Sequence, residues 1–116
     1  MSSEQDLQRT ALHWLNLQPD IFAWRNQSVG VYDANKKVFR KKGAFEISGT
    51  SDVLGVFSDG RIIAIEVKKP GSKESSLSDA QKAFLAKIKK MNGICGWIQS
   101  IEDLETIIND ARMGRD

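Results

Sequence analysis

Two apolar runs joined by a tight turn constrain the fold of this chain most strongly. Residues 51–57 and 61–68 are rich in Val, Ile, Leu and Phe, and the sequence Ser-Asp-Gly separates them. Apolar runs of this length around a turn signal predict a β-hairpin. Three charged residues, Asp52, Glu66 and Lys68, lie in the hairpin where packing would favour apolar side chains. The hairpin is therefore both a folding unit and a candidate site.

Hydrophobic periodicity predicts helices on either side of this hairpin. Leu7, Ala11 and Leu15 recur at helical spacing near the N-terminus, and Leu104 and Ile108 do so near the C-terminus. The predicted order is a helix at 3–17, a strand at 21–27, the strands at 51–57 and 61–68, a helix at 78–91, a strand at 94–99 and a helix at 101–112. This order predicts an α/β fold, with a mixed central sheet flanked by helices, in a single domain spanning residues 1–116.

Composition narrows the chemistry that a site could use. The chain contains one histidine and one cysteine, Cys95, so a zinc site built from His and Cys is excluded. Oxygen ligands remain, and these favour Mg²⁺ or Mn²⁺. No long apolar run predicts a membrane span, and the N-terminus lacks the pattern of a signal peptide. A lone cysteine suits a reducing compartment, so we expect a cytoplasmic protein.

Charge is distributed unevenly along the chain. Residues 28–44, predicted as a loop or a loose hairpin around Val38-Phe39, contain a basic cluster. The segment at 101–110 contains four acidic residues and no basic residue. Such polarity suits a protein that turns one face toward a polyanion, although a solvated loop and a solvated helix would give the same pattern. The members of the basic cluster are Lys36, Lys37, Arg40, Lys41 and Lys42.

The loop of the hairpin decides whether the two carboxylates meet. Side chains alternate along a strand, so Glu66 and Lys68 point to the same face. A two-residue loop would set Asp52 opposite Val67, with the two carboxylates on opposite faces. A three-residue loop with Gly60 in the left-handed conformation sets Asp52 directly opposite Glu66. We predict the three-residue loop.

Paired carboxylates in an apolar setting need a compensating charge. Burying them costs several kcal/mol each, and Lys68 offsets only part of that cost. A divalent cation bridging Asp52 and Glu66 would offset more. The structural alternative is a strand end at which Lys68 forms a salt bridge with Glu66.

The spacing of these residues resembles the PD-(D/E)xK nucleases, and the wider pattern resembles their VRR-NUC branch. Ser51 precedes the acid, where the superfamily's name has proline. The matching features are Gly49-Thr50-Ser51-Asp52-Val53-Leu54 as "G-x-x-D-hydrophobic", Ile65-Glu66-Val67-Lys68 with Pro70 as "E-hydrophobic-K-x-P", Gln81 in the following helix, Glu4 in the first helix, and Phe22-Ala23-Trp24-Arg25-Asn26 as the first strand of small, often phage-borne members.

The resemblance implies a restriction-endonuclease-like αβββαβ core with an added C-terminal helix. It also implies a Mg²⁺- or Mn²⁺-dependent endodeoxyribonuclease of a bacterial or phage-infected cell. Small stand-alone members resemble homodimers that cut branched DNA, four-way (Holliday) junctions above all, in repair and recombination. The last helix, with Ile107 and Ile108, and the strand at 94–99 are candidate dimer surfaces.

The resemblance also implies roles for single residues. Asp52 and Glu66 would be the metal ligands, with the backbone carbonyl of Val67 as a third. Lys68 would orient or deprotonate the attacking water and neutralise developing charge. Glu4 would hold a water on the metal or a second ion, although it could simply be an acid favoured by a helix N-terminus.

Gln81 has two interpretations. The resemblance implies a role in the site, whereas Ser78-x-x-Gln81 is also the pattern of a helix capping box. Basic and polar residues near the predicted site are candidate phosphate contacts, which strengthen binding without reading sequence. These are Arg25, Asn26, Lys69 and the basic cluster of residues 36–42.

Two other functions fit the same residues. The first is a nuclease for flaps, nicks or plain duplex DNA, because no feature of the sequence indicates which DNA structure the protein recognises. The second is a DNA-binding module that uses the fold without cutting. The intact set of Asp52, Glu66 and Lys68 favours an enzyme over a module.

Overall fold

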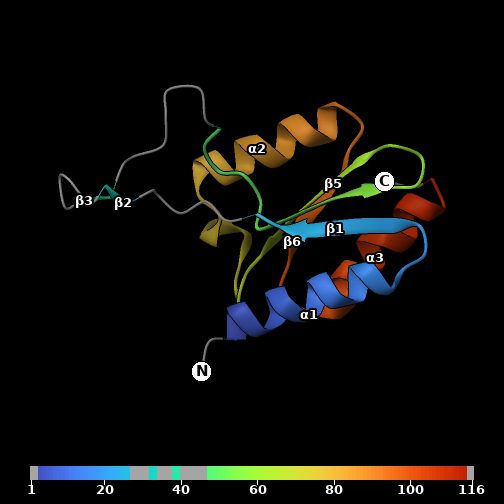
Figure 1. Ribbon diagram of the computed structural model, residues 1–116, viewed down its shortest axis with the longest axis horizontal. Helices are drawn as coiled ribbons and strands as arrows, with labels where there is room; N and C mark the ends of the chain where they lie inside the picture. The colour runs from blue at the N-terminus through green and yellow to red at the C-terminus, as the bar shows by residue number, and fades with distance from the viewer. Residues whose placement is uncertain (1–2, 27–31, 34–37, 40–46, 115–116) are drawn as a thin grey trace.

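The predicted hairpin forms the middle of a four-stranded sheet in the computed structural model, which describes residues 3–26, 32–33, 38–39 and 47–114. Helices cover both faces of this sheet (Figure 1). The elements in chain order are α1 (Ser3–Leu17), β1 (Ile21–Arg25), β2 (Tyr32–Asp33), β3 (Val38–Phe39), β4 (Val53–Phe57), β5 (Ile62–Val67), the 3₁₀ helix η1 (Glu74–Ser76), α2 (Asp79–Lys90), β6 (Ile94–Ile98) and α3 (Ile101–Arg112).

The sheet is mixed, with the strand order β1-β4-β5-β6. The pairs β1/β4 and β4/β5 are antiparallel, and β5/β6 is parallel, with α2 on the connection between the last two strands. This confirms the expected α/β fold and the restriction-endonuclease-like order of elements. The first strand ends at Arg25, earlier than predicted. The short strands β2 and β3 pair antiparallel, as the hairpin alternative for this segment required.

The β4/β5 turn confirms the predicted three-residue loop. The Phe57 N–H donates to the Arg61 carbonyl at 2.9 Å, and the Gly60 N–H donates to the Phe57 carbonyl at 2.8 Å. Gly60 has φ +94°, which glycine adopts without strain. Asp59 strengthens the turn, because its carboxylate accepts from both the backbone and the side chain of Arg61. The resulting register pairs Val53 with Ile65.

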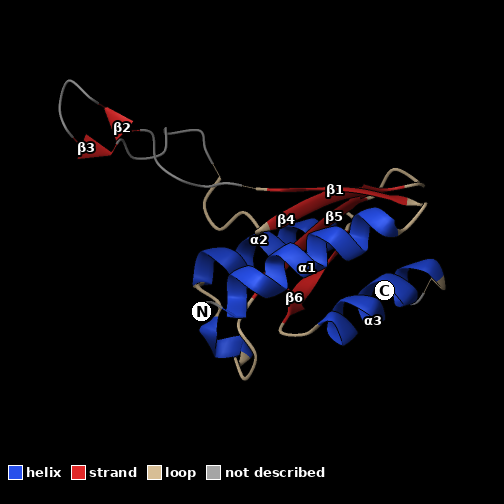
Figure 2. Ribbon diagram, turned by 60° about the horizontal axis from the view of Figure 1, so that its bottom comes forward, coloured by secondary structure: helices blue, strands red, loops and turns tan. Residues whose placement is uncertain are grey.

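The main core lies between one face of the sheet and the helices α1 and α3, which contact each other (Figure 2). A fully buried Ile or Leu side chain contributes about 1.5–3 kcal/mol, so this layer supplies most of the driving force for folding. Its fully buried large side chains are Leu15, Val53, Ile63, Ile65, Val67, Ile94, Ile98, Leu104 and Ile108. Ile108 is therefore unavailable as a dimer surface, which corrects that part of the expectation.

Helix α2 covers the other face of the sheet mainly over β5 and β6. The central strand β5 therefore has neighbouring strands on both sides and helices on both faces, and its residues 63–67 are all buried. Glu66 is one of them. Over β1 and β4 the same face keeps an exposed apolar row, formed by the cross-strand neighbours Phe22, Val56 and Ile62.

Candidate functional site

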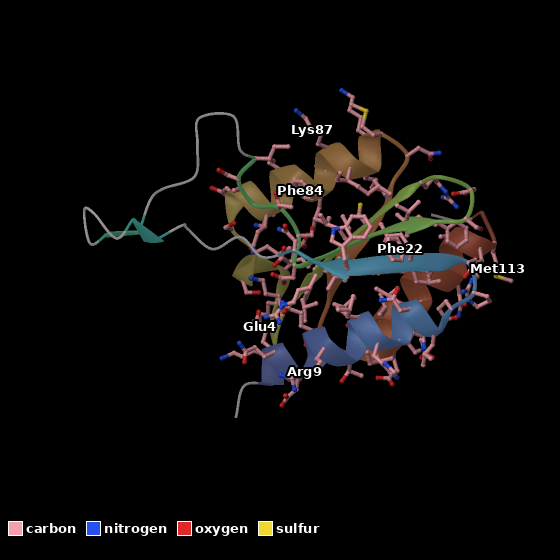
Figure 3. The ribbon with its side chains drawn as sticks, in the orientation of Figure 1. Glu4, Arg9, Phe22, Phe84, Lys87 and Met113 are labelled. Atoms are coloured by element: carbon pink, nitrogen blue, oxygen red, sulfur yellow. The ribbon has the colours of Figure 1, made fainter. Side chains whose placement is uncertain are left out.

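Four segments of the chain meet at one end of the sheet. They are the residue before β4, the end of β5, the first turn of α2 and the first turn of α1, where Figure 3 labels Glu4. The register of the hairpin continues by one residue to place Asp52 opposite Glu66. Asp52 is fixed there because its Oδ2 accepts a hydrogen bond from the Val67 N–H at 2.9 Å. The predicted approach of the two carboxylates is thus present.

Glu66 is the most unusual residue of this site. Its side chain is only 2% exposed, and its Oε2 is buried without a hydrogen-bond partner among the residues that the structure describes. Burial raises the pKa of this carboxyl from 4.5 to about 9, and the nearby Asp52 carboxylate adds to the shift. The charge of Lys68 acts in the opposite direction and that of Glu4 in the same direction. Glu66 therefore needs a proton or a cation at neutral pH.

Gln81 forms the capping box and also contacts Glu66. Its Oε1 accepts a hydrogen bond from the Ser78 N–H at 2.8 Å, while the Ser78 Oγ accepts from the Gln81 N–H at 3.1 Å. These contacts form a capping box at the start of α2. The other end of the same amide, Nε2, donates to Glu66 Oε1 at 3.1 Å. The glutamine is a helix cap and a contact of the site.

Gly49 allows the chain to cross directly over the first turn of α2. It has φ +77°, and a Cβ at this position would lie 2.3 Å from the carbonyl carbon and oxygen of Ala80. Any larger residue would push the segment before β4 away from α2. In the sequence, Gly49 stands out only as the first residue of the motif that ends at Asp52. Its position three residues before this acid is the one sequence signal that pointed to a structural role.

With this geometry, the comparison with known families is decisive. The sequence model of the VRR-NUC domain matches residues 33–101, more than half of the chain. The chain belongs to the VRR-NUC domain family. This is a nuclease family of the PD-(D/E)xK superfamily, so the protein is a DNA nuclease domain by family. No curated protein matches the chain.

The VRR-NUC match contains the residues that meet at the end of the sheet, except one. Asp52, Glu66, Lys68 and Gln81 lie inside it, whereas Glu4 on α1 lies outside. Lys68 directly follows β5 and is half-buried, and its N–H donates to the Ile98 carbonyl at 2.9 Å. The family match thus coincides with the carboxylate pair.

The chemistry of the donors suits a divalent cation of the Mg²⁺ or Mn²⁺ type. Asp52 and Glu66 offer hard oxygen atoms, and the buried Glu66 Oε2 is an acceptor in need of a positive partner. Within the described residues, no group of three or more Asp, Glu, His or Cys side chains is close enough to hold a metal. Glu4 therefore does not complete a three-carboxylate cluster, and any further ligands would be backbone or water oxygens.

The predicted DNA contacts fall into two groups. Asn26 lies beside the site, because its N–H donates to the Asp52 carbonyl at 2.8 Å. Arg25 and Lys69 have exposed side chains near this end of the sheet. The basic cluster, Lys36, Lys37, Arg40, Lys41 and Lys42, lies outside the described residues. None of the helices in the described part of the VRR-NUC chain has the length and apolar character that crossing a membrane requires.

Proposed function

We propose that this chain is a Mg²⁺- or Mn²⁺-dependent endonuclease that cuts branched DNA, four-way junctions above all, as a homodimer. The observation that carries the proposal is the buried Glu66 carboxyl, whose Oε2 has no partner among the described residues, beside the Asp52 carboxylate. Packing alone would place an apolar side chain at this position. In a nuclease family, a pair of acids of which one buried oxygen has no hydrogen-bond partner among the described residues supports a cation-dependent site.

Each residue of the site has a proposed role. Asp52 and Glu66 hold the cation, with the Val67 carbonyl as a further oxygen ligand. When bound, the cation would supply positive charge to the scissile phosphate and acidify the attacking water. Gln81 fixes the orientation of the Glu66 carboxylate through its amide hydrogen bond. Lys68 orients the attacking water or accepts its proton.

Glu4 acts at the edge of the site. Its charge is close enough to raise the pKa of Glu66, yet it does not join the two other acids in a three-carboxylate group within the described residues. We therefore assign it to a water near the cation or to a second ion. Its position on α1 makes this helix part of the site.

The distribution of charge supports DNA on the α2 side of the molecule. Helices α2 and α3 lie on opposite faces of the sheet (Figure 1). The charged residues of α2 are Asp79, Lys82, Lys87, Lys89 and Lys90, whereas those of α3 are Glu102, Asp103, Glu105, Asp110 and Arg112. A phosphate backbone is attracted to the first set and repelled by the second. Arg25, Asn26 and Lys69 are proposed contacts at the site itself.

One symmetry argument and one observation support a homodimer on a four-way junction. A C2 dimer presents two identical sites, which matches the two-fold symmetry of the junction. The exposed apolar row on β1, β4 and β5 offers a surface for self-association, with Phe22 68% exposed. Figure 3 shows Phe22 rising from β1 on the side of the sheet where α2 lies.

The test compares cleavage of a labelled four-way junction and a matched linear duplex in Mg²⁺, in Mn²⁺ and in EDTA. The wild type is run beside Lys68→Ala and the control Glu102→Ala, which removes an exposed charge of α3 on the opposite face of the sheet. We expect paired symmetric cuts in the junction alone, lost in EDTA and in Lys68→Ala but kept in Glu102→Ala.

Other outcomes separate the alternatives. Equal cutting of the junction and the duplex would keep the nuclease and remove the preference for junctions. Cuts in flaps or nicked duplexes alone would reassign the substrate. Tight binding without cutting, in either metal, would refute the enzyme and favour a DNA-binding module.

A further inference from the structure

The amide of Gln81 has two chemically different ends, and each meets a different partner. The oxygen end accepts from the Ser78 N–H at 2.8 Å, and the nitrogen end donates to Glu66 Oε1 at 3.1 Å. An amide turned by half a rotation would set two donors against each other at Ser78 and two acceptors at Glu66. The hydrogen bond from Ser78 therefore selects the orientation in which Gln81 is a donor to Glu66.

We infer that Ser78 is a positioning residue of the proposed nuclease site, whose backbone N–H holds the Gln81 amide so that it fixes Glu66 Oε1 and leaves Oε2 free for a cation. The inference rests on the proposed function. Two observations carry it together: the three-atom relay from Ser78 to Glu66, and the buried Oε2, which has no partner within the described residues.

The surrounding chain restrains this relay. Gly49 lies directly against the backbone of Ala80 and Gln81, so the first turn of α2 cannot move toward the hairpin. The Ser78 Oγ also accepts from the Gln81 N–H, but this hydroxyl is not part of the relay, which runs through the Ser78 N–H. Since Gly49 fixes the first turn of α2, the N–H of Ser78 remains aimed at the Gln81 side chain.

Two substitutions at one position separate the hydroxyl of Ser78 from its N–H. Ser78→Ala removes only the hydroxyl, whereas Ser78→Pro removes the hydroxyl and the N–H. Ser78 has φ −70°, which is the angle that proline prefers. Leu77, with φ −76° and ψ 135°, already has the extended conformation required before proline. The pair therefore differs in the one hydrogen bond under test.

The first readout is the Kd for Mn²⁺, measured by calorimetry in the absence of DNA. Removing a partner that orients a metal ligand lowers metal affinity by about 10–100-fold. We expect Gln81→Ala to fall in this range, Ser78→Ala to stay within about twofold of the wild type, and Ser78→Pro to bind about tenfold more weakly. In a Gln81→Ala background, Ser78→Pro and Ser78→Ala should bind Mn²⁺ equally, because the relay is already broken.

The outcomes distinguish this inference from the proposed function. A wild type that binds no Mn²⁺ would overturn the proposed function. A wild type that binds Mn²⁺, with equal affinities for Ser78→Pro and Ser78→Ala, would overturn only the role of Ser78. A loss in Ser78→Pro that persists in the Gln81→Ala background would also overturn it, because the effect would not pass through Gln81.

A second readout needs neither the proline variant nor a metal. The exchange rate of the Ser78 amide hydrogen reports its bond to Gln81 directly. We expect exchange to be at least tenfold faster in Gln81→Ala than in the wild type, and protection to be kept in Gln81→Glu, which retains an acceptor at this position. Equal exchange in the wild type and Gln81→Ala would refute the relay, even if Ser78→Pro did not fold.

Discussion

Replacing Glu66 by Gln should stabilise the metal-free protein at alkaline pH, although it removes a proposed metal ligand. Burial raises the pKa of the Glu66 carboxyl to about 9, so the folded protein keeps this group protonated at neutral pH, while the unfolded chain ionises it. A carboxyl whose pKa is raised in the folded state makes its full contribution to the stability of the fold at pH values below its unfolded pKa. This contribution is lost as the pH rises from the unfolded pKa to the folded pKa. Glutamine cannot ionise and therefore escapes the loss.

The size of the effect follows from the pKa difference. Each pH unit between the two pKa values changes the free energy of unfolding by roughly 1.4 kcal/mol. With values of 4.5 and about 9 for Glu66, the wild type should lose stability steadily between pH 5 and pH 8. That loss amounts to about 4 kcal/mol, a large part of the stability of an ordinary small domain. Glu66→Gln should exceed the wild type by about 1 kcal/mol at pH 5 and by about 5 kcal/mol at pH 8.

Urea unfolding in EDTA, followed by circular dichroism, measures how the free energy of unfolding of the wild type and of Glu66→Gln changes with pH. A difference of about 5 kcal/mol corresponds to a shift of about 2.5 M in the urea midpoint. The matched control is Asp59→Asn, because the pKa of Asp59 is lowered by its hydrogen bonds from Arg61 and its titration lies below this pH range. Parallel curves for the wild type and Glu66→Gln from pH 5 to pH 8 would refute the reasoning.

Four further substitutions test contacts and turns in the fold. Gly71→Ala, at φ +88° in open space, should cost about 1–2 kcal/mol in urea unfolding, whereas Gly49→Ala should cost at least about 2 kcal/mol more because its Cβ meets α2. Arg112→Ala should cost about 1 kcal/mol at neutral pH. The cost should shrink on acidification, because the Arg112 side chain lowers the pKa of Asp20 and its benefit is lost as that carboxylate is protonated. Asn16→Leu should cost about 2 kcal/mol and speed amide exchange in β1, because the Asn16 amide bonds both a backbone N–H and a carbonyl of that strand. Equal effects of Gly49→Ala and Gly71→Ala would refute the contact with α2.

The sequence was sufficient for the features that depend on local chemistry. Helical periodicity, apolar runs and turn signals together located the three helices and the four strands of the main sheet. The hairpin loop could be predicted because Gly60 adopts a left-handed conformation without strain, and Asp59 stabilises the turn. Once the loop length is known, the register and the approach of Asp52 to Glu66 follow from the alternation of side chains along strands.

Contacts between distant segments could not be predicted in the same way. From the sequence, Gln81 had two rival interpretations. Only the folded structure shows that the two ends of its amide make both contacts, one to Ser78 and one to Glu66. The need for Gly49 depends on where α2 begins in space, which no neighbouring residue encodes. The degree of burial of Glu66 depends on α2 covering β5 from one side while α1 and α3 cover the other. The roles of the basic cluster at residues 36–42 stay predictions, because these residues lie outside the described part of the chain.

The cost of burying Glu66 gives a direct test of what the site is for. A cation bound between Asp52 and Glu66 would replace the proton, so binding should be coupled to folding. At a free Mn²⁺ concentration a hundred times Kd, the wild type should gain about 2.7 kcal/mol. For a chain of 116 residues, this gain corresponds to a rise of about 10 °C in Tm.

The decisive comparison is the Tm of the wild type, Asp52→Ala and Asp59→Ala at pH 8, with and without Mn²⁺. Asp52→Ala removes one carboxylate of the proposed site, whereas Asp59→Ala removes an exposed carboxylate of the β4/β5 turn at the other end of the sheet. The rise in Tm should be kept in Asp59→Ala and lost in Asp52→Ala. The same rise in all three proteins would mean that Mn²⁺ binds elsewhere, and the buried Glu66 carboxyl would then have to be explained by a ligand other than a divalent cation.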